Sequence, residues 1–233
     1  MKIVRLHDTL YLKENRYKKP KECFKMLIRL LKKKINKKIK YKLIDIGCAN
    51  GELIFNLEKN FKNVEITGLD IRKDLINKAK KNVSRNINFI RKDISNKKFK
   101  LKNKYDIIIF SGVLAIFDNP NLVLKNLLKV LKPKGTIYIF DIFNMFDYNI
   151  YTKYEDIKMK KKVLQSGWNM LSLNFIKKFF KNKKVEFFKF NINKKIKKNK
   201  SDPLRTWTIK FQKKNYFTNA LNFIYHQYWI RIS

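Results

Sequence analysis

The sequence predicts an α/β fold in which a mostly parallel sheet lies between two layers of helices. Between residues 42 and 141, short apolar runs rich in β-formers alternate with longer segments of helical period, which is typical of successive βαβ units. The first apolar run leads into a loop that contains glycines, and an acidic residue lies at or near the end of each of the first three runs. With 233 residues, we expect one domain that spans residues 1–233.

Each element of the central segment can be placed from these patterns. The expected strands are 42–46, 64–69, 87–90, 105–110 and 135–141. The expected helices between them are 51–60, 72–83 and 121–132. Pro133-Lys134-Gly135 predicts the turn before the fifth strand. We therefore expect residues 41–141 to form the core that binds a ligand.

The flanking segments are expected to cover this core. A helix that Pro20 opens has one apolar face, and residues 1–40 therefore predict a helical cover over the ligand-binding end of the sheet. That face consists of Phe24, Leu27, Ile28 and Leu31. Residues 142–171 are rich in aromatic residues without clean periodicity, and they predict a cover over the substrate rather than a strand.

Residues 172–233 predict a last helix and further strands. The helix is expected at 173–181, and the strands at 185–192, 204–211 and 228–232. The lysine-rich run 194–200 predicts a solvated loop.

The net charge of +38, from 56 Lys and Arg against 18 Asp and Glu, raises the question of a nucleic-acid partner. Lys far outnumbers Arg, and Ile, Asn, Phe and Tyr are abundant too, which is the composition that AT-rich codons produce. Proteins that recognise base edges or bind phosphates commonly use Arg, whose guanidinium forms bidentate hydrogen bonds. We therefore interpret the charge as background composition and keep RNA binding as the alternative.

Other compositional features exclude several classes. No apolar run of about 18 residues is present and the first residues lack a signal-peptide pattern, so we expect no membrane span and a cytoplasmic protein. Cys23 and Cys48 lack the spacing of a zinc site, so we expect two reduced thiols and no metal.

The strongest functional signal is the strand 43–46 followed by the loop 47–51. Its small residues Gly47, Ala49 and Gly51 allow the backbone to approach a ligand closely. Such a turn is shared by nucleotide-binding folds in general. Two further acidic residues make the signal for a nucleoside ligand more specific. Asp70 ends the second strand, where a carboxylate can accept hydrogen bonds from ribose hydroxyls, and Asp93 follows the third strand, where it can accept from an adenine amino group.

In combination these segments resemble class I S-adenosylmethionine-dependent methyltransferases. Asp45-Ile46-Gly47-Cys48-Ala49-Asn50-Gly51, Asp70, Asp93-Ile94 and the segment 105–111 resemble the family's first four motifs, and 131–136 resembles the turn before its fifth strand. The resemblance covers residues 40–142. It implies a Rossmann-like three-layer α/β/α sandwich with a seven-stranded, mostly parallel sheet and an antiparallel C-terminal strand. It also implies S-adenosylmethionine (SAM) as cofactor and S-adenosylhomocysteine (SAH) as product.

Carried over by position, the resemblance implies the following cofactor contacts. Four residues would line the methionine part, namely Asp45, Gly47, Cys48 and Gly51. Asp70 and Ile71 would hold ribose and adenine, Asp93 and Ile94 the adenine edge, and Phe110 the sulfonium region. Ala49 departs from the family pattern, in which many members have glycine there. A dehydrogenase that uses a nicotinamide dinucleotide would also place an acid about 20 residues after a glycine loop, but this chain lacks Gly-x-Gly-x-x-Gly.

The catalytic residue is left open. Methyl transfer from a sulfonium is an in-line displacement that depends mainly on positioning, and a base is optional. The chain's two histidines, His7 and His226, are candidates for that base, although packing roles are the simpler interpretation. The same holds for the aromatic candidates for substrate contact, which are Tyr11, Tyr17, Trp168 and Trp207.

Motif absences narrow the acceptor. After the fourth strand stands Phe110-Ser111-Gly112-Val113, without the Asn/Asp-Pro-Pro-Tyr/Phe turn of base N-methylating enzymes or the acidic ligand of metal-dependent O-methyltransferases. Neither cysteine follows a proline as in cytosine-C5 enzymes. The ending resembles bacterial enzymes of surface-sugar and small-molecule biosynthesis. We therefore expect methyl transfer to oxygen or nitrogen of a small, possibly sugar-like molecule. The alternatives are an RNA or ribonucleoprotein methyltransferase and a catalytically silent SAM-binding partner, and the oligomeric state stays open.

Overall fold

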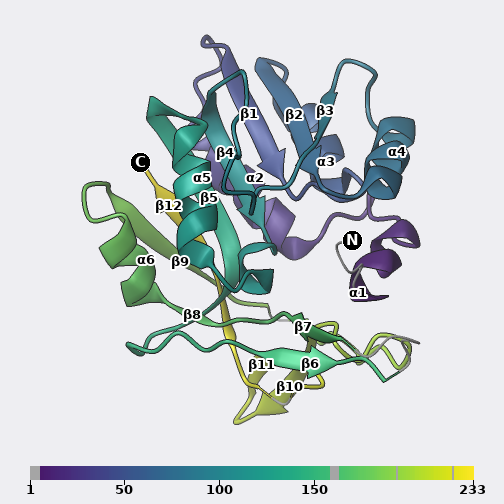
Figure 1. The fold of residues 1–233 in the computed structure, drawn as a ribbon. Helices are drawn as coiled ribbons and strands as arrows, with labels where there is room; N and C mark the ends of the chain where they lie inside the picture. The colour runs from purple at the N-terminus through teal and green to yellow at the C-terminus, as the bar shows by residue number, and fades with distance from the viewer. Residues whose placement is uncertain (1–5, 158–162, 193, 222) are drawn as a thin grey trace.

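Eight strands build the central sheet of the computed structural model, which describes residues 6–157, 163–192, 194–221 and 223–233. Seven of them form the row β3-β2-β1-β4-β5-β12-β9, and the short β8 pairs with β5 beside it (Figure 1). The neighbours from β3 to β5 are parallel, whereas β12 is antiparallel to both β5 and β9. The predicted fold class, with its antiparallel C-terminal strand, is confirmed.

All five predicted parallel strands are present. The sheet consists of β1 (Tyr41–Ile46), β2 (Val64–Asp70), β3 (Asn88–Arg91), β4 (Tyr105–Ser111), β5 (Leu131–Asn144), β8 (Leu171–Ser172), β9 (Val185–Phe190) and β12 (His226–Ile232). β5 is longer than predicted at both ends. It begins where Leu131 pairs with Tyr105 of β4, and it continues beyond Asp141 because Phe143 pairs with both β8 and β12.

Helices cover both faces of this sheet. α2 (Glu22–Lys32) and α3 (Glu52–Asn60) lie on one face with α4 (Lys73–Asn82) beside α3, and α5 (Pro120–Lys129) and α6 (Leu173–Phe179) lie on the other. The remaining helical turns are α1 (Leu6–Thr9), η1 (Leu10–Leu12) and η2 (Leu114–Ile116). Asn119 fixes the start of α5 because its side chain accepts a hydrogen bond from the Leu122 N–H. α5 ends three residues earlier than predicted, since the chain enters β5 at Leu131.

The position of α2 differs from the prediction. Its apolar residues pack with Leu43 and Ile107 on the face of the sheet, and only its first turn and the residues before it reach the carboxyl ends of the strands. Trp229 of β12 is fully buried beneath it, and the indole N–H donates to the carbonyl of Cys23 at 3.0 Å. The amphipathic pattern therefore predicted the buried side of α2 correctly but not the surface that it covers.

Two small hairpins and α1 lie at the end of the sheet where the parallel strands finish (Figure 1). β6 (Lys153–Glu155) pairs with β7 (Leu164–Ser166), so the segment 142–171 contains strands that the sequence analysis did not predict; residues 158–162 lie outside the described part. The predicted strand 204–211 is present as β10 (Trp207–Phe211), but it pairs with β11 (Lys214–Thr218) apart from the main sheet. Among the described residues, no helix combines the length and apolar character needed to cross a membrane.

Replacement of Trp229 tests how α2 is held to the sheet. We expect Trp229→Ala to lower the free energy of unfolding by about 3–5 kcal/mol, because it leaves a cavity in the core. Trp229→Phe keeps most of the packing but removes the indole hydrogen bond to the Cys23 carbonyl, so a loss of about 0.5–1.5 kcal/mol is expected. Urea denaturation followed by circular dichroism measures both changes. Phe146→Ala, at a side chain 70% exposed, is the control and should change the free energy of unfolding little. If Trp229→Ala lowered the free energy of unfolding no more than Phe146→Ala does, this account would be contradicted.

Candidate active site

A crevice of about 1510 Å³ lies at the carboxyl ends of the parallel strands. The ends of β1, β2, β3 and β4 and the loops after them line it, together with Phe140, Asp141 and Ile142 of β5 and segments from both ends of the chain. Ligands of open α/β sheets bind at this end, where the strand order reverses, here between β1 and β4. A pocket for one drug-sized ligand typically measures about 300–1,000 Å³, so this crevice has room for two ligands.

The loop after β1 turns sharply because of Gly47. Its φ is +80°, and a Cβ there would lie 2.4 Å from Cγ2 of Val113, so no side chain fits. The N–H groups of Gly47 and Cys48 both donate to the carbonyl of Leu69, at 2.7 and 3.0 Å. These bonds tie the loop to the end of β2. The predicted residues Gly47, Cys48 and Ala49 line the crevice, whereas Gly51 begins α3 behind it and is not among the described lining residues.

Asp45 and Asp70 place two buried carboxylates on the wall of the crevice. The Asp70 carboxylate accepts from the N–H groups of Ala49 and Arg72, both at 2.9 Å, and burial raises its pKa. Asp45 is only 2% exposed, and burial together with the charge of Asp70 raises its pKa to about 8. No cationic side chain among the described residues is paired with Asp45. The two acids thus form a site that favours a positively charged ligand.

The loop after β3 is fixed by α5. Asn126, fully buried in α5, donates to the carbonyls of Ile94 and Asn96 at 2.7 and 3.0 Å. Asp93 lines the crevice, and its Oδ1 accepts from the N–H and the hydroxyl of Ser95. Ile94 and Ile71 line the crevice as well. The structure therefore brings the predicted residues of three strand ends to one surface.

Other predicted residues lie elsewhere. Phe110 is fully buried in the core, stacked near Phe117, and is not among the described lining residues; Ser111 and Gly112 line the crevice instead. Trp207 in β10 is also outside the described lining, with Lys198 4.8 Å from its ring centroid. The sequence pattern placed Phe110 on the correct strand but could not show that its side chain points into the core.

His226 does not contribute a base to the described lining of the crevice. His226 pairs with Phe143 in the sheet, is not among the described lining residues, and has a pKa lowered by burial and by Lys189. The backbone of His7 lies in α1, and its side chain is outside the described residues. Tyr11 and Trp168 do line the crevice.

The N-terminal segment 11–17 is fastened over the loop after β1. The Asn50 side chain donates to the carbonyl of Tyr11 at 3.0 Å, and the Tyr17 hydroxyl donates to the carbonyl of Asn50 at 2.7 Å. Lys78 of α4 donates to the carbonyls of Leu12 and Glu14, both at 2.6 Å. The predicted N-terminal cover is therefore held by hydrogen bonds to backbone carbonyls, which the sequence does not show.

An ion pair joins this segment to the C-terminal part of the chain. Glu14 is buried and accepts a hydrogen bond from Arg205, which also pairs with Asp202. Lys21 lies 3.3 Å from the Glu14 carboxylate. Burial would raise the pKa of Glu14, but Lys21 and Arg205 outweigh it and the pKa is lowered. The sequence gives no signal for this contact, because the partners are far apart in the chain.

Asp141 is a lining residue that sequence reasoning missed. It lies near the end of β5 and is 7% exposed. Its carboxylate accepts from the N–H groups of Ala115 and Ile142, at 3.0 and 2.9 Å. A signal was present, since Asp141 comes directly after the apolar run 137–140 and ends the predicted fifth strand.

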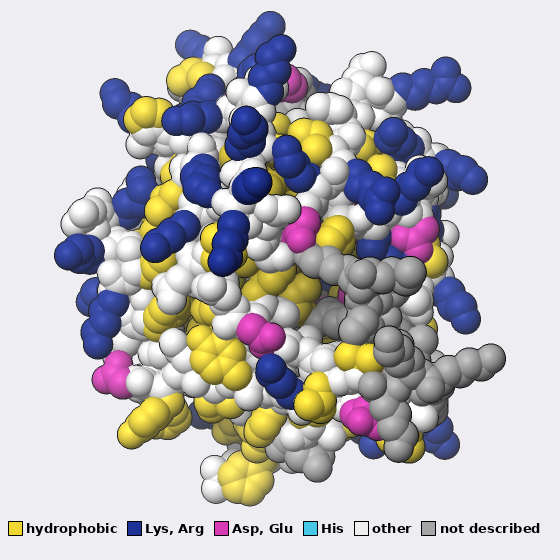
Figure 2. All heavy atoms as spheres, in the orientation of Figure 1, with side chains coloured by type: hydrophobic (Ala, Val, Ile, Leu, Met, Phe, Trp, Pro, Cys, Tyr) yellow, Lys and Arg dark blue, Asp and Glu magenta, His cyan; other side chains and the backbone are white. Residues whose placement is uncertain are grey.

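The crevice differs in charge from the rest of the molecule. Among the described residues that line it, ten are acidic and seven are basic, in a chain of net charge +38. The acidic ones are Asp8, Glu14, Glu22, Asp45, Glu52, Asp70, Asp74, Asp93, Asp118 and Asp141. Figure 2 shows Lys and Arg side chains over the upper part and the edges of the face, whereas hydrophobic and acidic side chains occupy its centre. In the described part of the chain, no group of three or more metal-ligating side chains is found.

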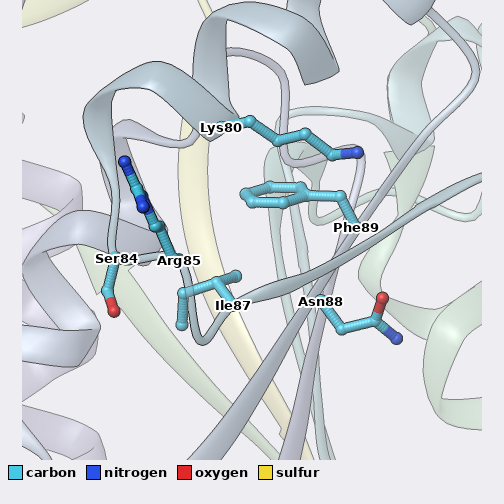
Figure 3. A pocket seen from close by; sticks show the side chains of 6 residues that line it. All are labelled: Lys80, Ser84, Arg85, Ile87, Asn88 and Phe89. Carbon is cyan, nitrogen blue, oxygen red and sulfur yellow. The ribbon is translucent and has the colours of Figure 1, made fainter.

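A second, smaller pocket of about 300 Å³ lies between the end of α4 and β3. Figure 3 shows Lys80 alongside the ring of Phe89, with Arg85 on the other side of the pocket. None of the predicted site residues lines it.

Comparison with known proteins identifies the family. A family model described as a methyltransferase domain matches residues 37–179. The malonyl-[acyl-carrier protein] O-methyltransferase 2 of Ilyobacter polytropus is 30% identical over 146 residues, which cover 61% of this chain and 54% of the relative. A tRNA (guanine-N(7)-)-methyltransferase of Prochlorococcus marinus is 29% identical over 51% of this chain and 65% of its own length. The chain thus spans about half the length of the first of these relatives.

A solved structure shows the same fold. The N-methyltransferase NodS from Bradyrhizobium japonicum WM9, in complex with SAH, superposes with a TM-score of 0.55 at 15% identity, covering 97% of this chain and 91% of NodS. The family model covers more than half of the chain, and the sheet has the expected mostly parallel order with one antiparallel C-terminal strand. The chain therefore belongs to the class I methyltransferases that use S-adenosylmethionine.

Proposed function

We propose that this protein transfers the methyl group of SAM to oxygen or nitrogen of a small-molecule acceptor. The observation that carries the proposal is the division of the crevice into two halves. The half at β1 to β3 presents the carboxylates of Asp45, Asp70 and Asp93. The half beyond β4 and β5 is lined mainly by apolar side chains, with Asp141 near the end of β5. The first half suits a cationic nucleoside, and the second leaves room for an acceptor.

The residues of the first half fit the cofactor. SAM supplies a methyl group on a positively charged sulfur and also carries an ammonium group. Asp45, buried without a cationic partner among the described residues, would hold that positive charge. Each Asp70 oxygen already accepts one backbone N–H and keeps a lone pair for a ribose hydroxyl. Asp93, Ile94 and Ile71 would bind the adenine.

The contribution of the protein is positioning. Holding the acceptor atom in line with the methyl carbon and the sulfur converts an encounter between two molecules into a reaction within one complex. The N-terminal segment and the ion pair of Glu14 with Arg205 form part of the lining of the crevice. His226 is not among the described lining residues, so we assign it no role in proton transfer.

The two alternatives receive less support. An RNA acceptor needs basic side chains at the reacting centre to neutralise phosphates, and the described crevice has more acidic than basic residues. A silent SAM-binding partner needs no acceptor space, whereas the crevice exceeds the volume of a pocket for one ligand. Because one of the relatives is a tRNA (guanine-N(7)-)-methyltransferase, RNA is included among the acceptors to be tested.

Loss of the Asp70 charge should weaken cofactor binding. We expect Asp70→Asn to raise the Kd for SAM and SAH by about 10- to 100-fold, because a charged hydrogen bond to the ribose contributes about 1.5–3 kcal/mol. Isothermal titration calorimetry in moderate salt measures it. Asp118→Asn, at a half-exposed carboxylate on the rim, should leave both affinities unchanged. No binding of SAH to well-folded wild-type protein would overturn the proposed function.

Binding of SAM should release a proton from Asp45. Its pKa of about 8 means that much of the unliganded protein holds a protonated Asp45 at pH 7. A bound cation favours the carboxylate and lowers this pKa, so the affinity should rise from pH 6 to about pH 8 and then level off. Calorimetry in buffers of different ionisation enthalpy counts the protons. Asp45→Asn stays neutral at every pH and should lack this component, and an equal proton release in both proteins would rule out the role of Asp45.

Turnover distinguishes the three functions. Formation of SAH from SAM should be measured with separate panels of amines, hydroxyl compounds and RNA. Turnover with a small molecule supports the proposal. Turnover with RNA alone supports the first alternative, and SAM binding without any turnover supports the silent partner.

A further inference from the structure

We propose that the acceptor is an apolar amine, with its hydrocarbon body against an aromatic wall of the crevice and its nitrogen at Asp141. This inference rests on the proposed function and adds the chemical class of the acceptor. It comes from three features of the acceptor half of the crevice, which are its aromatic lining, the pairing of its polar side chains and the position of a buried carboxylate.

The aromatic wall consists of four lining residues in one continuous series. Phe140 meets Phe190 edge to face at 5.5 Å, Phe190 stacks on Phe217 at 5.8 Å, and Phe217 stacks near Tyr225 at 6.3 Å between ring centroids. The rings come from β5, β9, β11 and the residue before β12. Aliphatic side chains extend this wall, namely Ile192, Ile196 and Leu204. Burial of an apolar ligand against this wall makes the free energy of binding more favourable.

Several polar side chains of this wall are already paired within the protein. The hydroxyl groups of Thr206 and Tyr225 share a hydrogen bond at 2.7 Å. Arg205 donates to both Glu14 and Asp202. A sugar, with a hydroxyl on most carbons, would have to break these bonds or leave its own groups without partners, at about 1–3 kcal/mol for each group. The wall therefore favours an apolar body over a sugar.

Asp141 gives the acceptor its polar end. The carboxylate lies in the lining near the end of β5. Burial and also the charge of Asp141 raise the pKa of Tyr225, so the carboxylate lies near this ring of the aromatic wall. Its oxygens accept hydrogen bonds from the Ala115 and Ile142 N–H groups, which hold the carboxylate in this orientation on the lining of the crevice. An ammonium or amine N–H can therefore donate to it. A neighbouring aromatic surface also favours a cation over a neutral or negative head group.

The transfer step is consistent with this placement. The acceptor nitrogen first loses a proton to solvent and then uses its lone pair to form the bond to the methyl carbon. The bond from carbon to sulfur breaks with its electron pair on sulfur, so the sulfonium becomes the thioether of SAH. The positive charge moves from sulfur to the nitrogen of the N-methylammonium product. A carboxylate beside that nitrogen stabilises the charge where it develops.

The first experiment compares three probes with one phenyl ring and different head groups. Wild-type protein saturated with SAH is titrated with 2-phenylethylamine, 2-phenylethanol and 3-phenylpropanoate. We expect the amine to bind at least about tenfold more tightly than the other two. Equal binding of the three, tighter binding of the carboxylate, or no binding of any at millimolar concentration overturns the inference. SAH is titrated first, so a failure of the proposed function is seen separately as a failure of SAH to bind.

Two variants then separate the head group from the wall. Asp141→Asn keeps the shape of the side chain and should abolish the preference for the amine while leaving SAH affinity within about twofold. Phe217→Leu should weaken the binding of all three probes together. Asp118→Asn, a rim carboxylate, is the matched control and should keep the amine preference. If Asp141→Asn does not fold, the comparison of probes on the wild-type protein and on Phe217→Leu still tests the inference. If Asp141→Asn folds and still prefers the amine, the proposed role of Asp141 is wrong.

Discussion

The close approach of two buried carboxylates, Asp45 and Asp70, is the constraint on which the site depends. Burial raises the pKa of both acids, and the charge of Asp70 raises the pKa of Asp45 further. Glu14 lies in the same crevice, but Lys21 and Arg205 pair with it and lower its pKa. Asp45 is not paired with a cationic side chain among the described residues. A positively charged ligand offsets the free-energy cost of the buried carboxylates. Because the parallel sheet brings the ends of β1 and β2 together, the fold itself favours a cationic cofactor.

The sheet is what brings these groups together. The parallel order places the ends of β1, β2, β3, β4 and β5 at one edge, and the antiparallel β12 returns the chain to the same core. Trp229 in β12 then bonds to the helix that follows the N-terminal segment, and Arg205 bonds to Glu14 within that segment. Contacts between the two ends of the chain therefore support one side of the crevice. Its acceptor half depends in part on β9 and β11, which lie in the last part of the sequence.

The sequence predicts what local pattern determines. The five parallel strands, the loop with Gly47 and the acids at three strand ends all follow from periodicity and spacing, and the structure places them as expected. The direction of the Phe110 side chain depends on how the sheet packs, and local pattern does not fix it. The contact of Glu14 with Arg205 depends on the complete fold. Asp141 ends the predicted fifth strand, but the resemblance assigns cofactor contacts only to residues at the first four strands.

Charge distribution connects the composition to the chemistry. More than half of the chain's 18 acidic residues line the crevice, although the crevice takes up a minority of its residues. The many lysines create a positive surface that repels a cationic cofactor at long range, but at physiological salt the Debye length is about 8 Å. Screening weakens the distant lysines, whereas the buried acids act at contact distance through a less polar medium. The site can therefore attract a cation inside a strongly basic protein, and the same local field disfavours an acceptor that brings phosphates to the reacting centre.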